Sequence, residues 1–88
     1  MAQAMIEVLF FGRVREELGC ERLQQAWDPD IADLDALQAA IIEQRGERWR
    51  EVLGQENMVR AVNQQVAQGN PILADGDEIA FFPPVTGG

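Results

Sequence analysis

One segment of the sequence has the spacing of a long amphipathic helix, and it separates two groups of strand-like segments. Apolar residues recur there every three or four positions and share one helical face, namely Leu34, Leu37, Ala40 and Ile41. Asp33 before them is a favourable N-cap residue, and Arg45-Gly46 after them favours a helix end. A helix with one apolar face buries it against another layer, so we predict an α+β fold with this helix on one face of a sheet.

The strand-like segments lie on both sides of this helix. We predict strands over residues 5–11, 21–27, 58–62 and 78–82, and a turn or short strand over residues 62–66. Short helical turns are predicted over residues 13–18 and 49–53. In this order the first and last strands pair in parallel at the centre of a mixed sheet, and the strands that flank the helix form its edges. That topology is the ubiquitin-like β-grasp.

The chain end has a composition of its own. Pro83 cannot donate to a sheet ladder, so we expect a globular domain over residues 1–83 and an extended, protruding tail over residues 84–88. A polyproline-like tail of this length reaches roughly 15 Å. Gly87 and Gly88 have no side chains, so a narrow tunnel admits them and receives the terminal carboxylate. Simple fraying of a small, polar chain end is the alternative interpretation.

Composition excludes several classes of function. The formal net charge of −8 argues against nucleic acid and anionic membranes as partners, and it favours either a basic protein partner or simple solubility. With no histidine and one cysteine, Cys20, a single chain forms no disulfide and no Cys/His metal site. We therefore expect a cytoplasmic protein with no metal and no bound cofactor. No apolar run approaches the roughly 20 residues of a membrane span.

Four stretches of the sequence together have a distinctive pattern. They are residues 6–11, 14–16, 61–64 and 73–88, the last ending in Phe81-Phe82-Pro83-Pro84-Val85-Thr86-Gly87-Gly88. With them the chain resembles the sulfur-carrier small subunits of molybdopterin synthase. The likeness runs nearly end to end and is loosest between residues 19 and 53. Thiazole-pathway sulfur carriers and ubiquitin share the Gly-Gly end but usually not the residues before it.

The resemblance implies a function and a set of partners. A ubiquitin-activating-type adenylyltransferase would use ATP to convert the Gly88 carboxylate to a glycyl adenylate. A persulfide sulfur donor would then convert it to a thiocarboxylate, 1-thioglycine. The tail would deliver this sulfur to cyclic pyranopterin monophosphate in the large catalytic subunit, within a heterotetramer. By this resemblance the chain is a sulfur-donating subunit that is not catalytic alone.

The resemblance also assigns roles to the other tail residues. Pro83 and Pro84 would hold the tail extended, and Gly87 would keep it slim. Val85 and Thr86 would line the channel of the large subunit, with a solvated spacer as the alternative for both.

A second group of residues matches family positions that dock partners. Phe11, Val66 and Phe82 belong to it, although large apolar residues in a small protein usually complete the core. Arg15 and Arg60 are candidates to pair with acidic residues of a partner, or to be solvated.

Three other functions remain open at this stage. The chain could be a sulfur carrier for thiamine synthesis or tRNA thiolation. It could be a modifier that is joined through Gly88 to lysines of other proteins. It could also be an interaction domain with an inert tail.

Overall fold

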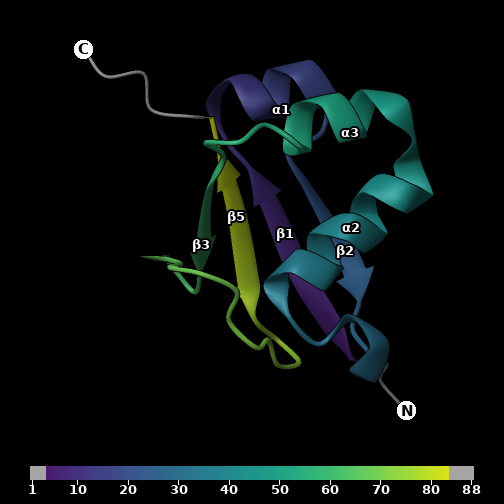
Figure 1. Cartoon of the computed structure of the whole chain (residues 1–88), viewed down its shortest axis with the longest axis vertical. Helices are drawn as coiled ribbons and strands as arrows, with labels where there is room; N and C mark the ends of the chain where they lie inside the picture. The colour runs from purple at the N-terminus through teal and green to yellow at the C-terminus, as the bar shows by residue number, and fades with distance from the viewer. Residues whose placement is uncertain (1–3, 84–88) are drawn as a thin grey trace.

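A mixed sheet and a set of helices form the part of the chain that the structure, a computed structural model, describes, residues 4–83 (Figure 1). The tail predicted over residues 84–88 lies outside these residues. The elements are β1 Met5–Phe10, α1 Gly12–Leu18, β2 Arg22–Ala26, the 3-10 helix η1 Pro29–Ile31, α2 Leu34–Arg45, α3 Glu47–Leu53, β3 Val59–Val62, β4 Gln65–Val66 and β5 Glu78–Phe82.

The strand order of the sheet is β2-β1-β5-β3-β4. β1 and β5 are parallel neighbours in the middle of the sheet, and the other neighbours pair in antiparallel fashion. This confirms the predicted α+β class and the central pairing of the first and last strands. The prediction that the strand after the helix forms an edge is wrong, because β4 pairs with the outer side of β3. Asn63 and Gln64 make this possible, since both adopt positive φ values (50° and 70°) that fit a tight hairpin turn.

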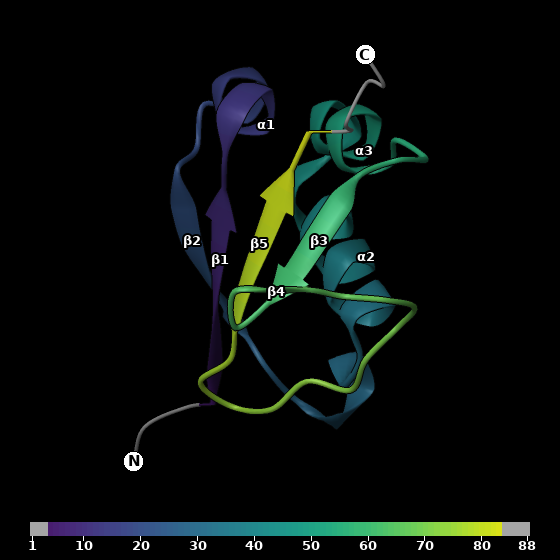
Figure 2. The same cartoon turned by 90° about the vertical axis from the view of Figure 1, so that its left-hand side faces the viewer.

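The core lies between one face of the sheet and the helices. Val8 pairs with Ile79, and Phe10 pairs with Phe81, so alternate residues of the two central strands point to the same face. The buried members of the core are Ile6, Val8, Phe10, Val14, Leu34, Leu37, Ile41, Val52, Leu53, Leu73, Ile79 and Phe81. Figures 1 and 2 show α2 along this face, with α1 and α3 near the end where β1 and β5 finish. The opposite face of the sheet carries no helix within residues 4–83.

Local signals in the sequence explain where α2 begins and how the chain turns before β5. An Asp33 carboxylate oxygen accepts from the Ala36 N–H at 2.8 Å, which confirms the predicted N-cap. Asp75 accepts from the Met5 N–H at 2.8 Å, and Asp77 accepts from the Ala74 N–H at 2.8 Å. These acidic residues therefore stabilise the turn before β5. Among the described residues, no helix is long and apolar enough to cross a membrane.

Candidate docking face and tail exit

Two aromatic rings stack on the open face of the sheet, beside the end of the last strand. The centroids of the Phe11 and Phe82 rings lie 4.8 Å apart, with 7° between the ring planes. Phe11 retains 39% of its surface exposed, and Phe82 is half-buried. Their neighbours Phe10 and Phe81 stack on each other inside the core, at 5.8 Å. The two consecutive phenylalanines at the end of β1 and the two at the end of β5 thus serve opposite faces of the sheet.

The strand register extends this aromatic pair across the sheet. Leu9 pairs with Ala80, Ala80 with Ala61, and Ala61 with Val66. These residues therefore form one row on the open face, and Val59 pairs with Phe82 in the next row. Val66 ends the row with 68% of its surface exposed. We call this group the apolar band: Leu9, Phe11, Val59, Ala61, Val66, Ala80 and Phe82. Ala61 and Ala80 are buried within it, at 4% and 7% exposed.

The rest of the open face is polar. One row further from the end of β5, Glu7 pairs with both Gln24 and Glu78. The side chain of Arg22 lies 3.5 Å from the Glu7 carboxylate. The side-chain oxygen of Asn63 accepts from the Glu78 N–H at 3.0 Å. The apolar surface is thus confined to the half of the open face where β5 ends. An apolar patch with a polar border is typical of protein interaction sites.

The chain leaves the sheet at Pro83, which follows directly on the apolar band. β5 ends at Phe82, as the missing N–H of proline predicts. Pro83 is half-buried and lies against Gly12, the first residue of α1. The other predicted tail residues, Pro84, Val85, Thr86, Gly87 and Gly88, lie outside the described residues, so their roles stay predictions.

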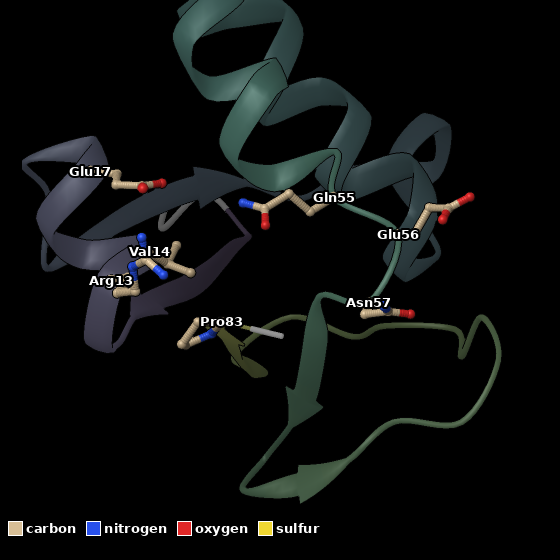
Figure 3. Close-up of a pocket in the computed structure, with 7 residues that line it drawn as sticks. All are labelled: Arg13, Val14, Glu17, Gln55, Glu56, Asn57 and Pro83. Carbon is tan, nitrogen blue, oxygen red and sulfur yellow. The ribbon is translucent and has the colours of Figure 1, made fainter. Parts of the chain in front are cut away.

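A groove of about 600 Å³ lies on the helix side of this exit (Figure 3). α1 forms one wall, the loop after α3 forms the other, and Pro83 lines it between them. We call it the polar groove, because most of its lining side chains are charged or carry amides: Arg13, Val14, Glu17, Gln55, Glu56, Asn57 and Pro83. The chain therefore leaves the domain with an apolar surface on one side and a polar hollow on the other.

The two candidate arginines differ in their surroundings. Arg60 is not free for a partner, because its guanidinium binds Asp35 at 2.6 Å, Gln38 at 3.0 Å and the Gly69 carbonyl at 3.0 Å. The suggestion that it pairs with a partner's acidic residue is therefore wrong. Arg15 is exposed on α1 and makes no ion pair within residues 4–83. Its role at an interface stays a prediction.

The single cysteine of this chain forms a local hydrogen bond. Cys20 is half-buried, and its Sγ donates to the Arg22 carbonyl at 3.3 Å. No group of three or more residues of metal-binding type lies together among residues 4–83.

Comparisons with known proteins identify similar chains. The model of the ThiS family matches residues 8–88. The molybdopterin synthase sulfur carrier subunit of Escherichia coli K12 is 43% identical, and the match covers 96% of this chain and all of that protein. The subunit of the same name from Mycobacterium tuberculosis H37Rv is 39% identical, with 94% and 96% covered.

Solved structures agree with this assignment. A complex of subunits 1 and 2 of the molybdopterin-converting factor from Helicobacter pylori contains a chain that is 35% identical, with a TM-score of 0.66. The match covers 96% of this chain and 99% of that one. Small archaeal modifier protein 1 from Haloferax volcanii is 30% identical, with a TM-score of 0.63, covering 93% and 99% of the two chains.

Proposed function

Because this chain belongs to the ThiS family and, within it, to the sulfur carrier subunits of molybdopterin synthase, we propose that Gly88 carries the sulfur on its terminal carboxyl group. The chain itself is a sulfur carrier for molybdenum cofactor biosynthesis. One observation supports the proposal more than any other. The Gly-Gly end follows a buried central strand at Pro83, next to the partly exposed Phe11–Phe82 stack. A rigid strand thereby positions the base of the tail beside a surface suited to a partner.

The chemistry requires activation, because a carboxylate is a poor electrophile. An adenylyltransferase of the ubiquitin-activating type joins the Gly88 carboxylate to AMP and releases pyrophosphate from ATP. The terminal sulfur of a persulfide donor then attacks the carbonyl carbon, and AMP leaves. A thiol cleaves the resulting S–S bond, which leaves a thiocarboxylate on Gly88. The ATP belongs to the activating enzyme, so the carrier itself binds no cofactor and is not catalytic alone.

The charged tail then enters the large subunit of the synthase. There the thiocarboxylate sulfur attacks cyclic pyranopterin monophosphate. Water then hydrolyses the acyl–sulfur bond, which leaves the sulfur on the product and a carboxylate on Gly88. A dithiolene contains two sulfurs, so each product needs two charged carriers. The interface must therefore be specific yet reversible. We propose a heterotetramer of two carriers and two large subunits, located in the cytoplasm.

The apolar band is the surface that we assign to the large subunit. Any partner that encloses the tail meets Phe82 and Phe11 first, because the chain leaves the sheet beside them. Large aromatic side chains in such positions provide much of the affinity of protein interfaces. The related Helicobacter pylori chain was solved as a complex of subunits 1 and 2 of the molybdopterin-converting factor, which supports the same kind of partner here.

Attachment to other proteins is the second candidate function. A solved neighbour at 30% identity is named a small archaeal modifier protein. In that case the activated Gly88 would form an amide with lysines of cellular proteins. Finding this chain on lysines of many proteins would favour the second function.

Removal of Gly88 tests the proposal in cells. We expect loss of molybdenum-enzyme activity in a strain whose only copy lacks this residue, although the domain stays folded. Cys20→Ser is the matched control, because the mechanism needs no thiol of this chain, and it should retain activity. Normal activity without Gly88 would instead favour an inert tail.

A further inference from the structure

The polar groove beside Pro83 has no role in the function proposed so far. We propose that it is a second docking surface, which receives a short basic segment of the large synthase subunit while that subunit encloses the tail. This inference rests on the proposed function. It adds a partner contact on the helix side of the domain, separate from the apolar band.

The position of the groove is the first argument. A channel that surrounds an extended chain has walls on every side, so the partner must also meet the helix side of the exit. Pro83 lines the groove, and it is the last described residue before the tail. A β carbon on Gly12 would lie only 3.3 Å from the Pro83 Cγ. This close packing on α1 fixes the base of the tail relative to the groove.

The charges of the groove are the second argument. Arg13, Glu17 and Glu56 are exposed and make no ion pair within residues 4–83. Two carboxylates and one guanidinium give the groove a net charge of −1, on a chain with a net charge of −8. Arg48 donates to the main-chain oxygen of Glu17 at 3.4 Å, which ties α3 to α1. The carboxylates of the groove therefore favour a cationic side chain from the partner.

The chemistry of the groove complements that of the apolar band. Apolar contact is non-directional and depends mainly on buried area. Charged groups placed at an interface select among partners and raise the association rate. Within the groove, Val14 is only 2% exposed, so the charged and amide-bearing side chains supply the groups with which a partner's side chain could pair. We assign affinity mainly to the band and partner selection to the groove.

Association kinetics with the purified large subunit of the same organism test this inference. The variant Glu17→Lys with Glu56→Lys reverses both carboxylates of the groove. Its matched control is Asp30→Lys with Glu43→Lys, which makes the same change in net charge at exposed positions outside the groove. Asp30 belongs to η1, at the end of the molecule away from the end of β5 (Figure 1). The control thus measures the effect of net charge alone.

We expect the groove variant to associate on the order of tenfold more slowly than the control at low salt, with a smaller difference at high salt. Arg13→Gln removes the cation that lines the groove and should speed association. Thermal unfolding of each variant verifies that it is folded. Equal rates for the groove variant and its control would overturn the inference and leave the proposed function standing. If the wild-type chain bound no large subunit, both this inference and the proposed function would fail.

Discussion

Gly12 and Pro83 pack directly against each other, so the start of α1 supports the base of the tail. A β carbon on Gly12 would lie 3.3 Å from the Cγ and 3.4 Å from the Cδ of Pro83. Gly12 also has a φ of +57°, where residues with a β carbon are strained. The positive φ and the close contact with Pro83 therefore both favour glycine at position 12. Both also influence the direction in which the chain leaves the sheet.

We predict that Gly12→Val slows sulfur transfer roughly ten- to hundredfold, because it displaces Pro83 and misaligns the tail. Gly19→Val is the control, since Gly19 has a similar φ of +64° but a β carbon there would meet no neighbouring atom within 4 Å. Each change should destabilise the fold by about 1–3 kcal/mol through backbone strain. Single-turnover assays with the charged carrier separate the two variants. Equal transfer rates would mean that the Gly12–Pro83 contact does not position the tail.

The two aromatic pairs allow a second comparison. We predict that Phe11→Ala weakens binding to the large subunit by about 2 kcal/mol or more, because Phe11 lies exposed on the apolar band. Its effect on the free energy of unfolding should be smaller than that of Phe10→Ala, because Phe11 keeps 39% of its surface exposed. Phe10→Ala should instead destabilise the fold by about 3–5 kcal/mol, because Phe10 is only 1% exposed. Titration calorimetry and urea unfolding measure the two quantities.

The reverse pattern would contradict this assignment of faces. If Phe11→Ala unfolded the domain while it left binding unchanged, the open face would belong to the core. Phe82→Ala should resemble Phe11→Ala in binding, with a larger loss of stability, because Phe82 is half-buried.

Arg60 should matter for stability and not for partner binding. Its guanidinium joins β3 to α2 through Asp35 and Gln38, and to the 67–70 segment through the Gly69 carbonyl. The side chain of Arg60 is 20% exposed. We predict that Arg60→Ala lowers the free energy of unfolding by about 1–3 kcal/mol, as for other charge-assisted hydrogen bonds. Affinity for the large subunit, measured on the folded variant, should match wild type. A large loss of affinity with unchanged stability would restore a role at the interface.

Much of the fold follows from local patterns in the sequence. The 3.6-residue spacing and the Asp33 cap predict α2, and the order of the strands around this helix places β1 and β5 at the centre of the sheet. The edge beyond β3 was only partly predictable, because the sequence left a turn or a short strand open over residues 62–66. β4 contains only two residues, and the turn before it, Asn63-Gln64, lacks the glycine that usually marks a tight hairpin.

The candidate site was only partly predictable, for a related reason. The family resemblance identified Phe11, Val66 and Phe82 as residues that dock partners. Neither the resemblance nor the strand patterns could identify Ala61 as part of the same apolar band, because its place there depends on strand pairing with both Val66 and Ala80. The pairing of Arg60 with Asp35 also escaped detection. These residues are 25 positions apart, and only the packing of α2 near β3 brings them together.

The length of the tail is a further prediction. An added, uncleavable residue after Gly88 should abolish sulfur transfer, because the carboxylate must reach a fixed depth in the partner and must stay terminal. The thermal unfolding of this variant should match wild type, since the addition lies beyond the sheet. An alanine added before Met1 is the control and should leave transfer intact. Full activity of the extended tail would show that its reach is not critical.

The most direct test is the intact mass of the protein purified from cells that make the molybdenum cofactor. The account predicts a population in which one oxygen has been replaced by one sulfur. Fragmentation should assign this exchange to Gly88, and it should disappear in cells that lack the activating adenylyltransferase. Cells that make the cofactor normally while this chain never carries the exchange, even when the large subunit is depleted, would contradict the account.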